Sequence, residues 1–255
     1  MKKSTVNIPV NGRFLLIFAL FWMNPVFSSC EDKAEPGVNW ASCDLSGKDF
    51  KNNDLSGAVL TGANVDGADF SRANLENTDF NFAKLDNAHF DGARMTNSRL
   101  VAVKATAASF RDAVLENSWF SRATLKKTDF TGAKADKANF YEANLESAIF
   151  TDARLIKTSF EQTDLTRASF ERAVLTSSVL RKARLHETSF VGADAGKANF
   201  DEADGRAADF TGADLTKASF RQADIEESIF TGAILRDTIW SDYKRCRASS
   251  VGVCR

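Results

Sequence analysis

The chain has 255 residues, of which 44% are hydrophobic and 26% are charged, and its formal net charge is −1. This composition excludes a disordered chain, and the near balance of charge does not indicate the concentrated basic surface that binds nucleic acids. Phe outnumbers Tyr by 21 to 2, which indicates a large dry core because Phe has no group that needs a hydrogen bond.

Residues 1–28 are predicted to be a signal peptide. A basic start, with Lys2 and Lys3, leads to the uninterrupted apolar run Phe14–Met23, about half of the ~20 residues that a membrane-spanning helix needs. The small residues near Ser28 favour cleavage after it. We therefore expect a protein of the bacterial periplasm or cell exterior. Two alternatives remain, an uncleaved anchor and lipidation of Cys30, and only the latter would attach the mature chain to a membrane.

Residues 29–44 are predicted to form an N-terminal cap, which contains Cys30 and Cys43. The other two cysteines, Cys246 and Cys254, lie at the far end of the chain. An even number of cysteines in an exported chain predicts disulfides, and four cysteines allow three pairings. A rigid rod would hold its two ends apart, which favours the pairs that are local in sequence.

A bulky residue recurs at every fifth position from Leu45 to Trp240, apart from four small residues in this register, and a small residue, mostly Ala, stands two positions before it. The four exceptions are Ala105, Ala135, Ala195 and Gly205. Five residues rotate by about 140° on an α-helix, so the bulky residues would point to all sides. On a straight strand each step of five changes the face. One buried solution remains, in which the chain turns a corner in every repeat and four repeats enclose the bulky residues.

This pattern resembles the pentapeptide-repeat family, whose motif is A-(D/N)-L-x-x. Matches stand at Ala63-Asn64-Val65, Ala73-Asn74-Leu75, Ala143-Asn144-Leu145 and Ala213-Asp214-Leu215, and the resemblance covers residues 43–240. It implies an all-β solenoid, the right-handed quadrilateral β-helix, with about ten coils over residues 45–240. Residues twenty apart then stack, so one column holds Phe in every coil from Phe50 to Phe230.

Both ends of a stacked solenoid expose its apolar core, so we expect a cap at each. Trp40 and Trp240 belong to one column and are predicted to cover the core at the two ends. Residues 241–255 are predicted to form a disulfide-closed C-terminal cap. This tail is similar to closing segments of exported family members, although Tyr243 stands where those often carry Gly.

No catalytic residue, cofactor site or metal site is predicted. His89 and His186 lie in different columns about five coils apart, so they cannot share a metal ion or a catalytic triad. No Cys and His spacing fits zinc, and the coils carry no insertion that would build a cleft. We therefore expect that the protein is not an enzyme and needs no cofactor.

Four apolar residues are predicted to point outward on one side over four successive coils: Phe82, Val101, Trp119 and Tyr141. Arg99 and Arg122 flank them. Contiguous exposed aromatic residues are typical of binding sites, whereas scattered surface apolar residues are normal. We predict that these residues contact an unknown protein partner or a second copy of the chain.

A second feature is a file of lysines on one face: Lys137, Lys157, Lys197 and Lys217. Three acidic residues stand close by in the sequence: Asp136, Asp194 and Asp214. We expect these carboxylates to neutralise the lysines, so that the file is a solvated stripe.

The sequence thus predicts a non-enzymatic, exported structural or protein-interaction solenoid of the bacterial envelope. The alternative is a DNA-mimicking inhibitor of gyrase or topoisomerase, as in the quinolone-resistance members of the family. Those members imply a cytoplasmic protein with a strongly negative surface. This chain has a predicted export signal and a balanced charge, and no nucleic-acid partner is expected.

Overall fold

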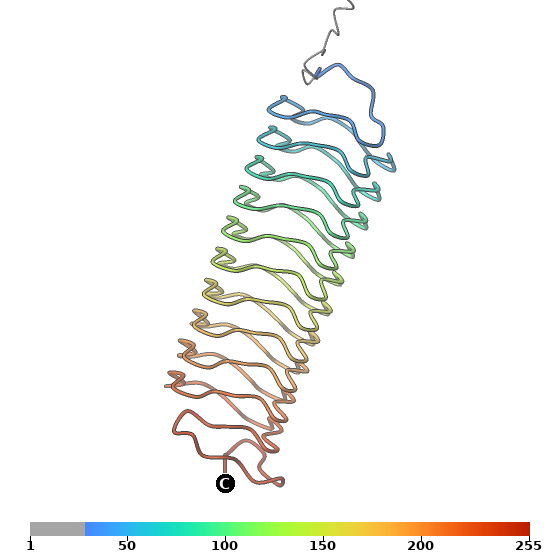
Figure 1. Cartoon of the computed structure of the whole chain (residues 1–255). Coiled ribbons are helices and arrows are strands. Elements are labelled where there is room, and N and C mark those ends of the chain that lie inside the picture. Colours follow the sequence, from blue (N-terminus) through green and yellow to red (C-terminus); the bar gives the residue numbers. More distant parts are fainter. Residues whose placement is uncertain (1–28) are drawn as a thin grey trace, which may run out of the picture.

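The computed structural model describes residues 29–255, a straight rod of stacked coils, and the predicted signal peptide lies outside the described residues (Figure 1). The described part contains no helix and no continuous strand. It is held by isolated parallel bridges between residues twenty apart, from Asn39 and Val59 to Ser219 and Ile239. The bridges confirm the predicted coil of twenty residues.

Each pentapeptide ends in a tight turn. The backbone N–H of Ala153 donates to the carbonyl oxygen of Phe150 at 3.0 Å, and the same bond recurs along the rod. The third residue of the turn has a positive φ, between 55° and 70°, at every fifth position from Ser42 to Asp237. This left-handed residue is typical of a type II turn. Because a corner follows every five residues, four repeats close one coil.

The Asp or Asn of the repeat motif stabilises this turn. Asp69 Oδ1 accepts the backbone N–H of Ser71 at 2.9 Å, and Asp214 Oδ1 accepts that of Thr216 at 2.8 Å. Such side chains imitate a backbone turn, which explains why the motif prefers Asp and Asn. Many Asp side chains of the rod therefore stabilise its turns.

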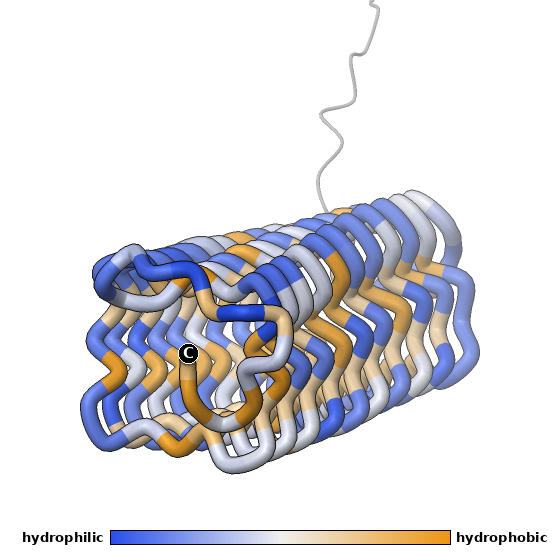
Figure 2. Tube along the Cα trace, turned by 90° about the horizontal axis from the view of Figure 1, so that it is seen from below, coloured by the Kyte–Doolittle hydropathy of each residue, from blue (hydrophilic) through white to orange (hydrophobic). Residues whose placement is uncertain are grey.

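The core is built from columns of mostly apolar residues twenty positions apart, and the backbone tube in Figure 2 shows hydrophobic positions repeated from coil to coil. From Phe50 to Phe230 the Phe rings stack with centroids 4.7–5.1 Å apart. They meet rings of a second column edge to face, as Phe150 meets Phe160 at 5.6 Å. Phe150 and Phe160 are fully buried, so the predicted inward positions are confirmed.

Buried Ser and Thr at the small position link successive coils. Thr158 Oγ1 donates to the carbonyl oxygen of Ala135 at 2.8 Å, and Thr188 Oγ1 donates to that of Leu165 at the same distance. The hydroxyl of each is satisfied inside the rod, so Ser or Thr can replace Ala without leaving a buried polar group unpaired.

The two ends of the described chain lie at opposite ends of the rod (Figure 1), and each carries a disulfide. Cys30 pairs with Cys43, and Trp40 packs over the Phe50 ring with centroids 5.1 Å apart. Trp40 is 2% exposed, and its indole N–H has no hydrogen-bond partner among the described residues.

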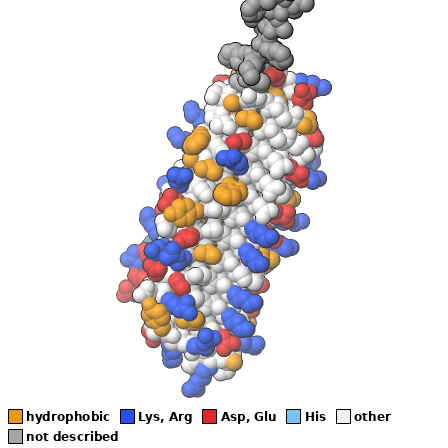
Figure 3. Space-filling view, in the orientation of Figure 1, with side chains coloured by type: hydrophobic (Ala, Val, Ile, Leu, Met, Phe, Trp, Pro, Cys, Tyr) orange, Lys and Arg blue, Asp and Glu red, His pale blue; other side chains and the backbone are white. Residues whose placement is uncertain are grey.

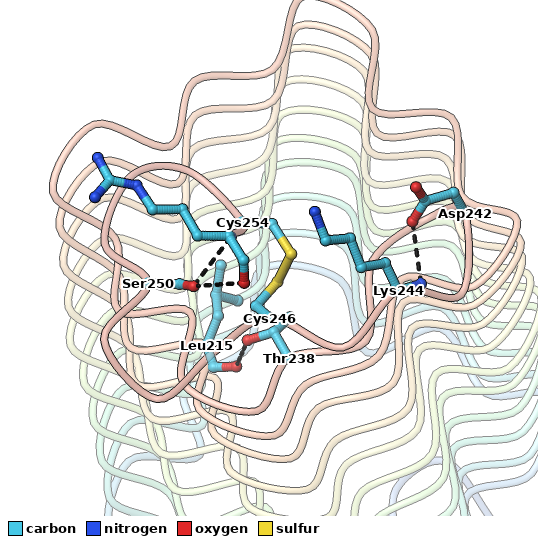
Figure 4. Close-up of a disulfide and its surroundings, with 8 residues drawn as sticks. Leu215, Thr238, Asp242, Lys244, Cys246, Ser250 and Cys254 are labelled. Atoms are coloured by element: carbon cyan, nitrogen blue, oxygen red, sulfur yellow. Dashed lines mark hydrogen bonds between the residues drawn. A yellow bond between two sulfur atoms is a disulfide. The ribbon is translucent and has the colours of Figure 1, made fainter.

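At the other end the chain reverses direction and pairs with the last coil. Two antiparallel bridges join Ile234 to Val251 and Ile239 to Arg245. Figure 4 shows the disulfide between Cys246 and Cys254 in this end segment, with Thr238 beside it. Both disulfides are therefore the pairs that are local in sequence.

Candidate interaction surface

The described residues contain no group of three or more His, Cys, Asp or Glu side chains that could hold a metal ion. His89 and His186 are both exposed, and His186 Nδ1 lies 3.1 Å from the carbonyl oxygen of Arg206. The two histidines lie on different sides of the coil, as the twenty-residue register requires. Between residues 29 and 255, no helix is long and apolar enough to cross a membrane.

We use the name aromatic patch for Phe82, Val101, Trp119 and Tyr141. The register places these residues on one side of the rod. Arg99 and Trp119 are bridge partners, and the backbone N–H of Phe82 donates to the carbonyl oxygen of Val101 at 2.9 Å. The N–H of Arg122 donates in the same way to Tyr141 at 2.8 Å. The patch therefore extends over successive coils.

Two members of the aromatic patch are strongly exposed. The exposed fraction is 65% for Phe82 and 53% for Trp119, whereas Val101 and Tyr141 are half-buried. Each occupies a bridge or turn position, where the side chain leaves the coil. These rings therefore add nothing to the core of the rod, and their exposure to water is unfavourable.

A hollow of about 560 Å³ opens beside Trp119. Its lining is Asn97, Arg99, Val101, Trp119, Ser121 and Arg122. Of the aromatic patch, only Val101 and Trp119 line it. Sequence reasoning missed the contributions of Asn97 and Ser121. That of Ser121 could have been found, because it lies twenty residues after Val101 in the same file.

The hollow is positively charged. Neither Arg99 nor Arg122 has an ion pair with any other described residue, whereas Arg154 pairs with Asp136 at 2.8 Å. Next to them, the pKa of the Tyr141 phenol is raised, first because it hydrogen-bonds to the Glu142 carboxylate and then by desolvation. The aromatic patch thus combines exposed rings with two uncompensated guanidinium groups.

The predicted lysine file is exposed, and none of its four lysines has an ion pair within the described part of the chain. The expected neutralisation is not found. Asp136 pairs with Arg154 instead, and Asp194 Oδ1 accepts the N–H of Gly196 in its own turn at 3.1 Å. Asp214 Oδ1 likewise accepts the N–H of Thr216 in its own turn.

A sequence signature described as the pentapeptide repeat region matches residues 37–110, 103–172 and 163–240. The chain belongs to the pentapeptide-repeat family. The pentapeptide-repeat fold is a right-handed β-helix, in agreement with the twenty-residue register of the bridges. The matched residues include the whole aromatic patch and the whole lysine file.

Solved pentapeptide-repeat proteins are similar to this chain. HetL, involved in heterocyst differentiation regulation in the cyanobacterium Nostoc, is 24% identical over 82% of this chain and 92% of its own, with a TM-score of 0.47. A trypsin-treated QnrB1, a plasmid-mediated fluoroquinolone resistance protein, is 22% identical over 74% and 91%, with a TM-score of 0.36. A protein of the Arabidopsis thaliana thylakoid lumen is 24% identical over 56% and 85%, with a TM-score of 0.25. No curated protein sequence matches the chain.

Proposed function

We propose that this chain is an exported, non-enzymatic rod of about ten coils that binds a protein partner through the aromatic patch. The rod is closed by caps at residues 29–44 and 241–255. The observation that carries the proposal is the exposure of Phe82 and Trp119, at 65% and 53%, beside the hollow lined by Arg99 and Arg122. Exposed aromatic rings with arginines are the composition enriched at the centres of protein interfaces.

The charge of the patch selects the kind of partner. Two arginines without ion pairs favour a surface on which an apolar side chain is flanked by carboxylates. A second copy of the chain fits less well, because a two-fold contact would bring Arg99 and Arg122 against the same residues of the other copy. Like charges that meet in an interface are unfavourable. We therefore infer a different, acidic protein as the partner.

Export is supported by the apolar run Phe14–Met23 and by the pairing of all four cysteines in disulfides. Disulfides persist in oxidising compartments and are rare in the cytosol. Mass spectrometry of the protein from its native host tests this part of the proposal. We expect a mature chain that begins at Ser29, and a chain that still carries Met1 or a lipid on Cys30 would contradict it.

The partner proposal is tested by capture of envelope proteins and by sedimentation. The double variant Phe82→Ser, Trp119→Ser removes the two exposed rings without touching the core. The matched control is Ile149→Ser, Ile229→Ser, which removes two exposed apolar side chains from another side of the rod, where they are 40% and 47% exposed.

We expect the patch variant to lose a specific partner that both the wild type and the control retain. The mass in solution should not change, since the partner is a different protein. If the patch variant recovers the same partners, the proposal is wrong. If it changes the oligomeric state instead, the patch joins two copies of the chain.

A further inference from the structure

The lysine ridge, which we define as Lys137, Lys157, Lys197 and Lys217, runs along one corner of the rod. All four residues hold the left-handed turn position, with φ between 58° and 60°. Successive coils are about 4.8 Å apart, so Lys137 and Lys157 are close neighbours, as are Lys197 and Lys217. Figure 3 shows basic side chains in a file beside uncharged surface on the visible face.

The fold gains nothing from lysine at these positions. A left-handed residue is most favourable as Gly or Asn, and the earlier coils have Gly57, Asn77, Asn97 and Asn117 in the same file. The change to Lys in later coils replaces favourable turn residues by strained ones. It also brings like charges together without a compensating carboxylate at ion-pair distance within the described residues. An external anion would relieve this repulsion.

An uncharged strip lies beside the ridge, two residues further along each repeat. Consecutive bridges define it as one file: Asn139, Ser159, Val179, Asn199 and Ser219. These side chains are half-buried, and none carries a charge. Asn139 and Asn199 use Oδ1 to accept the N–H groups of Tyr141 and Asp201, each at 2.8 Å.

The strip therefore presents hydrogen-bond donors to a ligand. The Nδ2 groups of Asn139 and Asn199 have no partner in the described part of the chain, and neither has the hydroxyl of Ser159. Amide and hydroxyl donors in a straight file suit a ligand that repeats along the rod and carries hydroxyl oxygens. Asp194 and Asp214 adjoin the ridge on its other side, away from the strip. The carboxylates that adjoin the strip itself are paired with arginines, Glu161 with Arg181 at 2.5 Å and Asp201 with Arg221 at 3.5 Å, and the hydroxyl of Ser219 donates to Asp201.

We propose that the lysine ridge and the uncharged strip together bind a linear anionic polysaccharide, laid along the axis of the rod. The ammonium groups face the carboxylates of the polymer, and the strip donates to its hydroxyl groups. An anionic membrane would use the same charges but gains little from the strip, in which Val179 is the only apolar side chain. The site contains none of the four residues of the aromatic patch, but it adjoins the patch, since Asn139 is the bridge partner of Trp119. The proposal does not rest on the proposed protein partner, and it is tested at Lys157 and Lys197, in later coils than the patch.

Titration calorimetry of the purified protein with polygalacturonate tests the proposal. Neutral dextran and phosphatidylglycerol vesicles serve as comparison ligands. The test variant is Lys157→Asn, Lys197→Asn, which restores a residue found in three earlier coils of the same file. The control is Lys84→Asn, Lys104→Asn, which makes the same change of charge on another side, where Asn64 and Asn144 stand in the same file.

We expect the ridge variant to bind polygalacturonate about tenfold more weakly than the wild type. The control should bind as the wild type does, and binding should weaken as the salt concentration rises. Thermal unfolding of the ridge variant should occur at no lower temperature, since Asn suits the turn.

Three results would overturn the proposal. The first is equal affinity of the ridge variant and the wild type, or equal losses in the ridge variant and the control. The second is binding of dextran as strong as that of polygalacturonate. The third is ridge-dependent binding of the vesicles without binding of polygalacturonate, which would assign the ridge to lipid headgroups.

Discussion

Individual residues of the rod point either inward or outward. Substitutions at the two kinds of position should change the free energy of unfolding by different amounts. Phe150 is fully buried between Phe130 and Phe170, whose ring centroids lie 4.7 and 4.8 Å from its own. Thr151, the next residue, is half-buried, and its side chain makes one long polar contact, 3.4 Å from its hydroxyl to that of Ser169. Phe150 therefore packs in the core, whereas its neighbour Thr151 lies at the surface.

Truncation of Phe150 should be costly because its neighbours are fixed in a stacked column and cannot close the cavity. We expect Phe150→Ala to lower the free energy of unfolding by about 3–5 kcal/mol. Thr151→Ala should lower it by less than about 0.5 kcal/mol. Chemical denaturation compares the two variants, and equal effects would show that the inward assignment is wrong.

Asp69 shows how a turn carboxylate makes stability depend on pH. Burial raises its pKa, but the hydroxyl and N–H of Ser71 and the Lys51 ammonium lower the pKa by more, to about 2. A pKa depressed in the folded state stabilises the protein above the unfolded pKa of about 4, and this contribution is lost as the pH falls from about 4 to about 2.

Asp69→Asn should keep the turn but remove this charge-dependent contribution. We expect the variant to be less stable than the wild type at pH 7 by about 1–2 kcal/mol, after an allowance for solvent exposure, and equally stable near pH 2. Urea denaturation at a series of pH values measures the difference. A constant difference over the whole range would mean that the Asp69 carboxylate is not selectively stabilised in the folded state.

At the scale of the structural element, the pentapeptide could be predicted from the sequence because its strict period leaves one way to bury the large residues. The hydrogen bond by which the motif Asp or Asn stabilises the turn could not be predicted, because the backbone N–H that it accepts needs a side-chain partner only once the turn has formed. The partners of the long charged side chains were not predictable either. Arg154 reaches Asp136 on the previous coil, and such choices between exposed partners depend on small energies.

The C-terminal tail is an element whose order depends on one disulfide. Cys246 N–H donates to Thr238 and Gly252 N–H to Ala233, at 2.8 and 2.9 Å, and Cys254 closes the loop. In the double variant Cys246→Ser, Cys254→Ser, we expect the tail to lose about 2–3 kcal/mol of stability.

Hydrogen exchange locates this effect. The Gly252 amide should lose protection, whereas the Ala153 amide in the middle of the rod should keep it, because each coil depends mainly on its neighbours. Equal loss of protection at both amides would show that the tail holds the whole rod together. Unchanged protection of Gly252 would show that backbone pairing alone fixes the tail.

The whole molecule is a rod whose core is uniform and whose surface is not. The solenoid fold and the grouping of Phe82, Val101, Trp119 and Tyr141 on one side follow from the twenty-residue register, and could be predicted. The hollow beside Trp119 could not, because its depth depends on how Arg99 and Arg122 lie over the coils. A rod of this kind offers long, straight surfaces, so separate ligands can occupy successive segments of one side.

Site-specific photo-crosslinking in the native host tests most directly whether the aromatic patch contacts a protein partner. Trp119→benzoylphenylalanine places a photoreactive group at the hollow, and Ile149→benzoylphenylalanine places it at an exposed site on another side, where Ile149 is 40% exposed. We expect irradiation to give one defined adduct with another protein from position 119 and none from position 149. The absence of an adduct at position 119, or the same adducts from both positions, would contradict the account.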